Sequence, residues 1–191
     1  SERTFLSLNE SERREEKRRT LTDVMELAAA FFQDQLQTSA GAKARAYLRE
    51  RGLSARTIDT FRLGFAPDSR NALKEYLAGK GVDKKEMEAC GLLVHGPDIA
   101  VSYDRFRDRI MFPILSSRDA VIAFGGRAMR PDAMAKYLNS NETELFHKSN
   151  VLFNFTRARR SLSGAGGAST VIAVEGYMDV IALHQAGVEN A

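Results

Sequence analysis

The stretch that decides the fold is TVIAVEGYMDVIALHQAG, residues 170–187. An apolar run ends at an acid, Glu175; a glycine follows, and a second acid, Asp179, comes one helical turn later. An apolar run followed at once by helical spacing predicts a β-strand at 170–175 and a helix at 177–186, which together form the βα unit of a parallel sheet. Because ligands of such sheets bind at the carboxyl ends of the strands, Glu175 is a candidate site residue.

The two neighbouring acids favour one of two arrangements. Hard cations such as Mg²⁺ bind carboxylate oxygens, so Glu175 and Asp179 together suit a metal site. Alternatively, Asp179 caps the start of the helix, where a negative charge interacts favourably with the helix dipole. The spacing of the two acids does not decide between these arrangements.

The composition predicts a soluble globular protein. The chain has 191 residues, of which 43% are hydrophobic and 28% charged, enough for one large domain or two small ones. No apolar run approaches the roughly 18 residues of a membrane-spanning helix, and the N-terminal residues are polar, so we expect no membrane partner. The single Cys90 cannot form an internal disulfide, which fits a cytoplasmic location, and the one Cys and three His lack zinc-site spacing.

Charge is distributed unevenly along the chain. Residues 101–160 contain eleven Lys or Arg and six Asp or Glu, whereas residues 161–191 contain no Lys or Arg and three acids. A basic middle next to an acidic end suits a polyanion held beside a metal site. Chance surface charge is the alternative, and charge alone does not exclude it.

The first hundred residues predict mainly helices. The charged segment 1–19 is expected to be a flexible arm or an exposed helix start, and apolar residues at helical spacing predict an amphipathic helix over 22–37. Shorter helices are expected to follow. Their expected cap residues are Gly52, Ser54, Asn71 and Asp83.

After about residue 100 the apolar runs become short and rich in β-formers. RIMFPIL (109–115) and AVIAFGGRAM (120–129), separated by the polar SSRD, predict a β-hairpin. AKYLNS (135–140) and VLFNF (151–155) are further candidate strands, and SGAGGAS (163–169) predicts a linker. The expected units are therefore an arm and helix at 1–38, a second unit at 39–165 and a third at 168–191.

VIAVEGYMDVIALHQAG resembles the opening strand and helix of the Toprim fold, in the form found in bacterial DnaG-type DNA primases. Other segments resemble successive primase segments, in the order of that family. They are YLRERGLSARTIDTFRLGFAPD (47–68), YDRFRDRIMFPI (103–114), VIAFGGRAM (121–129) and KYLNSNETELFHKS (136–149). Together the matching segments cover most of residues 40–191.

The resemblance implies a fragment of the catalytic core with a mixed α/β (α+β) fold. A helical N-terminal part would lead into a small, basic, β-rich subdomain and then into the first βα unit of a Toprim parallel sheet. The zinc-binding domain of the family, its further metal-binding acids beyond Ala191 and its C-terminal helicase-binding domain would all lie outside this chain.

The basic residues of the matching segments are candidates for nucleic-acid contacts. Arg105, Arg107 and Arg109 alternate in sequence, which on a strand would make one positive stripe. Arg127 follows two glycines, whose backbone could approach a phosphate closely. In primases the matching residues line the groove for the single-stranded template. The resemblance therefore implies template binding by Arg105, Arg107, Arg127, Lys136 and Lys148, and less strongly by Arg51.

The implied function is a DNA primase, a nucleotidyltransferase that joins ribonucleoside triphosphates into short RNA primers on single-stranded DNA. Mg²⁺ or Mn²⁺ would be the cofactor, Glu175 would serve as a metal ligand or as an acid/base group, and Asp179 would support it. The replicative helicase would be a partner through the absent C-terminal domain. The chain alone is expected to be inactive or nearly so. The alternatives are a non-catalytic single-stranded-DNA-binding module and another Toprim enzyme, such as a phage primase–helicase.

Overall fold

A computed structural model describes residues 2–163 and 169–191 of the chain, and most of the expected linker at 163–169 lies outside the described residues. The helices are α1 (Glu2–Gln37), α2 (Ala42–Glu50), α3 (Ala55–Thr60), α4 (Ala72–Gly79), α5 (Lys84–Ala89), α6 (Phe155–Leu162) and α7 (Tyr177–Gln185), with 3-10 turns at Ser39–Gly41 and Lys148–Asn150. The strands are β1 (Gly64–Ala66), β2 (Leu93–Val94), β3 (Tyr103–Asp104), β4 (Arg109–Leu115), β5 (Val121–Ala128) and β6 (Tyr137–Asn139). The predicted mixed fold is confirmed. No described helix combines the length and apolarity needed to cross a bilayer.

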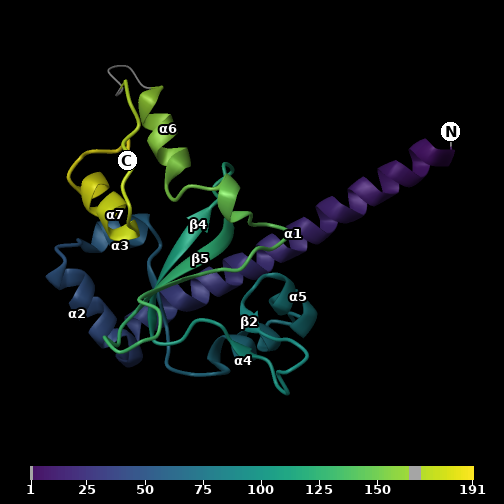
Figure 1. Ribbon diagram of the computed structural model, residues 1–191, viewed down its shortest axis with the longest axis horizontal. Coiled ribbons are helices and arrows are strands. Elements are labelled where there is room, and N and C mark those ends of the chain that lie inside the picture. Colours follow the sequence, from purple (N-terminus) through teal and green to yellow (C-terminus); the bar gives the residue numbers. More distant parts are fainter. Residues whose placement is uncertain (1, 164–168) are drawn as a thin grey trace.

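The charged N-terminal segment is helical and continues into the predicted amphipathic helix, so α1 is one long element. Residues 9–20 are exposed along its first half, which projects from the body of the molecule (Figure 1). From Leu21 onward one face is buried, including Met25 and Phe32. Burial of this face in the second half of α1 attaches the helix to the sheet. There the rings of Phe32 and Phe124 meet edge-on with centroids 5.2 Å apart.

The predicted hairpin is confirmed as β4 and β5, which form the centre of an antiparallel sheet with the order β1-β4-β5-β6. The candidate strand at 135–140 is present as β6 at the sheet edge. The candidate strand at 151–155 is wrong, because Asn154 adopts a left-handed conformation with φ of 62° and α6 begins directly after it.

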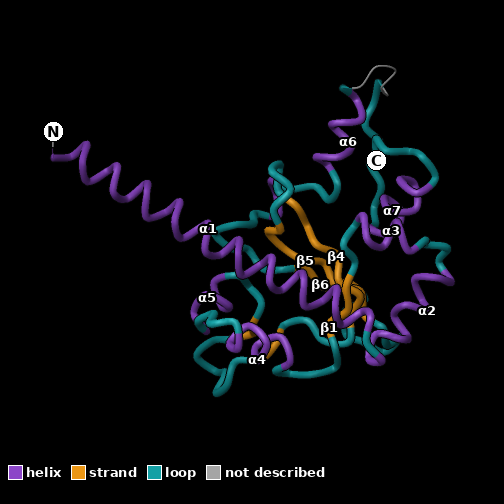
Figure 2. The backbone as a smooth tube through the Cα atoms, turned by 180° about the vertical axis from the view of Figure 1, so that it is seen from behind, coloured by secondary structure: helices purple, strands orange, loops and turns teal. Residues whose placement is uncertain are grey.

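Two apolar clusters pack against this sheet, whose strands are drawn in orange in Figure 2. One joins α1 to strand residues such as Phe124, together with α4 and α5. The other joins α2, α3 and α7 to the sheet, with Leu48, Phe112 and Ile181 all buried. The acidic C-terminal segment is therefore packed on the sheet through α7.

The strand predicted at 170–175 is absent from the structure. Residues 171–174 have no regular secondary structure, and the side chains of Val171, Ile172 and Val174 are 45%, 39% and 38% exposed. A strand requires a neighbour for its N–H and C=O groups. Within the described residues the segment has one such backbone bond, from Ile172 N–H to the carbonyl of Asn190 at 2.8 Å, and no strand beside it. The helix predicted at 177–186 is confirmed as α7.

The cap of α4 also differs from the prediction. The Asn71 side chain makes no cap hydrogen bond. Instead, the buried carboxylate of Asp104 accepts from the backbone N–H groups of Leu73 at 2.8 Å and Lys74 at 3.0 Å. Burial raises the pKa of Asp104 to about 6, so at neutral pH it is still an anion that can accept both bonds. A residue distant in sequence therefore replaces the local cap.

We expect Asp104→Ala to lower the free energy of unfolding by about 2–3 kcal/mol, because it leaves two N–H groups at a partly buried helix start without an acceptor. Asn71→Ala is the control and should change stability by less than about 0.5 kcal/mol. Urea denaturation followed by circular dichroism measures both variants. Equal losses from the two substitutions would contradict this assignment of the cap.

Candidate functional site

Tyr177, the first residue of α7, anchors the acidic segment on the sheet. Its ring stacks on Phe112 with centroids 5.1 Å apart and meets Phe153 edge-on at 4.8 Å. Its hydroxyl donates a hydrogen bond of 2.8 Å to the side-chain carbonyl of Asn139 on β6. Burial raises the pKa of Tyr177 to about 12, so the hydroxyl keeps its proton at neutral pH and remains a donor. The chain just after Glu175 is thus fixed by packing and by a hydrogen bond.

The two glycines before Arg127 make room for side chains. A Cβ at Gly125 would lie 2.5–2.7 Å from three atoms of the Tyr177 side chain, two in the ring and the hydroxyl oxygen. A Cβ at Gly126 would lie 3.0 Å from atoms of Phe106 and Arg109. The prediction that these glycines leave the backbone open to a phosphate is therefore wrong, because side chains of the protein cover both positions.

The other end of α7 is fixed by Gln185. Its side-chain carbonyl accepts from Ser54 N–H at 2.8 Å, and its side-chain amide donates to the carbonyl of Gly52 at 2.7 Å. Between the two ends, Ile181 is fully buried against the sheet side of the molecule. The helix after Glu175 is therefore held at its start, its middle and its end.

The two candidate acids have different surroundings. Glu175 is exposed and lines a pocket of about 540 Å³. The carboxylate of Asp179 accepts from Gly176 N–H at 3.2 Å, which is the helix-capping arrangement. Within the described residues, no three His, Cys, Asp or Glu side chains gather as a metal site requires. These residues do not form a divalent-metal site by themselves, and Glu175 is the acid left free to contribute to one.

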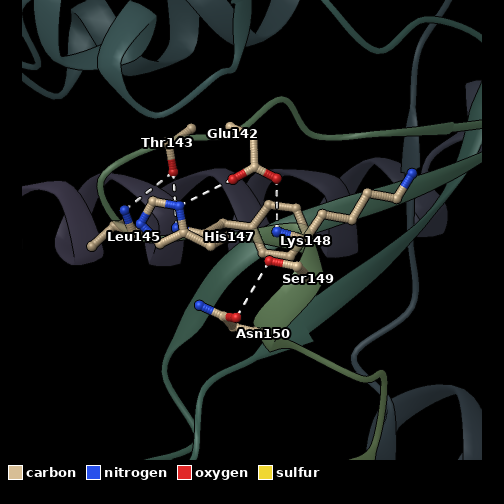
Figure 3. A network of polar contacts seen from close by, with 8 residues as sticks. Glu142, Thr143, Leu145, His147, Lys148, Ser149 and Asn150 are labelled. Carbon is tan, nitrogen blue, oxygen red and sulfur yellow. Dashed lines mark hydrogen bonds and ion pairs between the residues drawn. The ribbon is translucent and has the colours of Figure 1, made fainter.

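Lys148 lines the same pocket as Glu175, together with Tyr137 and Asn139. Its loop is held by Glu142, whose carboxylate accepts from Lys148 N–H at 2.8 Å and contacts the His147 ring nitrogen at 3.0 Å (Figure 3). These hydrogen bonds lower the pKa of Glu142. The Lys148 backbone is therefore tied down, while its side chain extends from the loop beside the pocket.

The positive stripe expected from the alternating arginines is wrong. Asp108 adopts a left-handed conformation with φ of 48°, so residues 105–108 are not part of a strand. Two of the three arginines bind backbone carbonyls near the edge strand β6. Arg105 donates to the carbonyl of Asn139 at 2.8 and 3.2 Å, and Arg109 donates to that of Gly126 at 3.1 Å.

Arg107 has a different environment. It donates to the carbonyl of Asp104 at 3.1 Å, and its guanidinium carbon lies 5.0 Å from the centroid of the Tyr103 ring. Arg70, which the sequence did not single out, lies over the same ring at 4.0 Å. Burial lowers the pKa of Arg109, and the charges of Arg107 and Arg105 act in the same direction, whereas that of Asp108 opposes them.

Arg51 and Arg127 meet at Tyr47 of α2, and Lys136, just before β6, lies beside the end of β5. Arg127 and Arg51 lie over the Tyr47 ring, at 4.2 and 5.1 Å from its centroid. Lys136 is exposed, and its carbonyl accepts from Ala128 N–H at 2.8 Å, next to Arg127. Sequence reasoning missed Tyr47, although it precedes Arg51 by one helical turn, the spacing at which helical side chains meet.

Comparisons with known proteins agree on one family. The family described as "DNA primase catalytic core, N-terminal domain" matches residues 31–159. DNA primase of Deinococcus radiodurans is 43% identical over 162 residues, and DNA primase of Pseudomonas aeruginosa is 44% identical over 172 residues. These alignments cover 85% and 90% of this chain, and 28% and 25% of the two relatives.

Solved structures of the same family also share the fold of this chain. The DnaG primase catalytic domain bound to single-stranded DNA has a TM-score of 0.82 at 39% identity, over 92% of this chain and 53% of that one. The RNA polymerase domain of Mycobacterium tuberculosis primase, in complex with a DNA oligomer, has a TM-score of 0.82 over 90% and 52%. The chain thus spans about a quarter of the curated relatives and about half of the solved chains. With a family match over residues 31–159 and a shared fold, this chain belongs to the family of the DNA primase catalytic core, N-terminal domain.

Proposed function

We propose that this chain is the template-binding part of a DNA primase, which joins ribonucleoside triphosphates into short RNA primers on single-stranded DNA. The observation that carries the proposal is a set of basic side chains without carboxylate partners among the described residues, leading from α2 to the pocket that Glu175 lines. They are Arg51, Arg127, Lys136 and Lys148. Such groups neutralise backbone phosphates of nucleic acid without reading sequence.

The two predicted arginines of the Asp108 turn are assigned narrower roles. Arg105 is half-buried and its guanidinium donates to a carbonyl of β6, so its role is to stabilise this edge strand. Arg107 lies over Tyr103 beside Arg70 and adds positive charge to the template path. Both residues remain part of the proposed template groove. Arg105 stabilises its strand β6, and Arg107 contributes positive charge.

Glu175 is the proposed acid of the reacting centre. In primer synthesis a primer 3′-hydroxyl attacks an α-phosphate and pyrophosphate leaves, and a bound Mg²⁺ or Mn²⁺ supplies stabilisation of the developing negative charge. Glu175 would contribute one metal ligand or a proton acceptor there. Asp179 would keep α7 capped and so hold Glu175 in place. Ribonucleoside triphosphates and a replicative helicase are the further partners that family membership suggests.

Salt-dependent binding of single-stranded DNA is the first test. We expect fluorescence anisotropy with a labelled oligothymidylate to give an affinity that falls linearly with salt on logarithmic axes. Arg127→Ala should weaken binding and reduce the slope by about 0.7, the contribution of one single-strand phosphate. Lys85→Ala, which removes an exposed charge on α5, is the matched control and should leave the slope unchanged. Absence of salt-dependent binding would rule out the template-binding role.

A non-catalytic single-strand-binding module is the second candidate. The observation in its favour is that the described residues lack a cluster of three potential metal ligands. Both candidates predict DNA binding by this chain. They differ in whether Glu175 is needed for nucleotide transfer once the rest of a catalytic core is present.

A further inference from the structure

Tyr47 brings two positive side chains from different parts of the chain to one aromatic ring. Arg51 follows it by one turn at the end of α2, whereas Arg127 is on β5. Their guanidinium carbons are 5.1 and 4.2 Å from the ring centroid. Both distances are within the range at which a cation over an aromatic face is attracted by the ring. A tyrosine therefore contacts both arginines of the proposed template path.

The ring is in a fixed position. Tyr47 is partly buried and packs against the apolar cluster that joins α2 to the sheet. The next residue, Leu48, is fully buried in that cluster. Arg127 is equally constrained, since β5 pairs with β4 on one side and with β6 on the other, opposite Ile110 and Tyr137. Tyr47 thus links two elements whose backbones are already held.

The two guanidinium groups keep unused hydrogen-bonding capacity. Some other arginines of the described chain pair with carboxylates, as Arg62 does with Glu26 at 2.7 Å. No described carboxylate lies within ion-pair distance of Arg51 or Arg127. Arg127 uses one N–H on the carbonyl of Ala128 at 3.1 Å. Contact with a ring face leaves the N–H edge of a guanidinium free, and that edge matches phosphate oxygens.

We propose that Tyr47 is a positioning residue for nucleic-acid phosphates: its ring holds the guanidinium groups of Arg51 and Arg127 in place, ready to bind the backbone of a single strand. The proposal rests on the template-binding function proposed above. A long side chain that is already held loses less conformational entropy when it binds, so the ring raises affinity without touching the DNA. Tyr47 therefore acts through the two arginines.

The test measures binding of a labelled oligothymidylate by the 191-residue chain at fixed low salt. Tyr47→Leu removes the aromatic face and keeps an apolar side chain, whereas Tyr47→Phe keeps the ring and removes only the hydroxyl. We expect Tyr47→Leu to weaken binding by about threefold to tenfold, and Tyr47→Phe to change it by less than about twofold. Tyr47→Met is a second non-aromatic variant if the leucine variant is unstable, and thermal unfolding monitors folding in each case.

The same substitution in a chain that carries Arg51→Ala and Arg127→Ala separates positioning from direct contact. There Tyr47→Leu should change the dissociation constant by less than about twofold, because the groups through which it acts are absent. An equal loss in both backgrounds would overturn the proposal, since the ring would then contact DNA itself. No loss in the parent chain would overturn it as well. If the parent chain does not bind DNA, the proposed function fails first and this inference fails with it, which is a different result from binding that ignores Tyr47.

Discussion

Glu175→Gln is expected to reduce primer synthesis by at least about a hundredfold in a primase polypeptide that continues this chain through its catalytic core. Glutamine has the shape of glutamate but neither its negative charge nor its capacity to accept a proton. Glu175 is exposed and lines the pocket beside Lys148. Its substitution should therefore leave the fold and template binding intact and remove only the chemistry. Incorporation of labelled ribonucleotides on a single-stranded template, with Mg²⁺ or Mn²⁺, measures the effect.

Glu189→Gln is the matched control, because it removes an exposed acid from the same C-terminal segment. It should retain primer synthesis within about twofold, in the range of an ordinary surface substitution. Full activity of the Glu175 variant would contradict the proposed role and would leave the acid as a surface residue. Robust primer synthesis by residues 1–191 alone would contradict the expectation that this chain lacks part of the catalytic site.

Local sequence patterns predicted the elements whose stability is local or depends on close neighbours. The hairpin of β4 and β5 follows from two apolar runs around a polar turn, and it forms as predicted. The helix at α7 follows from its apolar spacing and begins and ends within a residue of the prediction. The predicted cap at Ser54 is also present, accepting from Thr57 N–H at 3.1 Å. In each case the groups that satisfy the backbone are near one another in sequence.

The predictions that failed depend on partners distant in sequence. The apolar run at 171–174 predicted a strand, but a strand also needs a neighbouring strand, and the described chain offers none. Asn71 is a good cap by type, yet Asp104 from another segment occupies the position. The arginine alternation assumed extended backbone, which the left-handed Asp108 interrupts. Residue type gave the chemistry of these positions, and tertiary contacts decided their geometry.

The proposed site shows the same division. Glu175 and the basic side chains were found from sequence because acids and bases are recognisable by type. Tyr47 and Asn139 were missed, since one acts through a ring that holds two arginines and the other through a hydrogen bond to Tyr177. The spacing of Tyr47 and Arg51 was readable from the sequence, but the contacts of Tyr47 with Arg127 and of Asn139 with Tyr177 join distant residues and need the fold. The supporting residues of a site are therefore harder to predict than the residues that bear its charge.

Gly125→Ala is expected to lower the free energy of unfolding by about 2–4 kcal/mol, a large effect for one added methyl group. The new Cβ would lie 2.5–2.7 Å from three atoms of the Tyr177 side chain, well inside van der Waals contact. The ring cannot move aside easily, because Phe112 stacks on it and Phe153 meets it edge-on with centroids 4.8 Å apart. Either the strand shifts or the ring leaves its position, and both lose buried contacts.

Gly79→Ala is the control, since Gly79 ends α4 and an added Cβ there meets nothing within 4 Å. It should be neutral or stabilise by up to about 1 kcal/mol, and urea denaturation compares the two glycines directly. Combining Gly125→Ala with Tyr177→Ala should cost at least about 1 kcal/mol less than the sum of the single changes, because without the ring the clash is gone. Additive costs would mean that Gly125 matters for some other reason. Non-additive costs would mean that the missing Cβ on β5 is what allows α7, and Glu175 before it, to pack where they do.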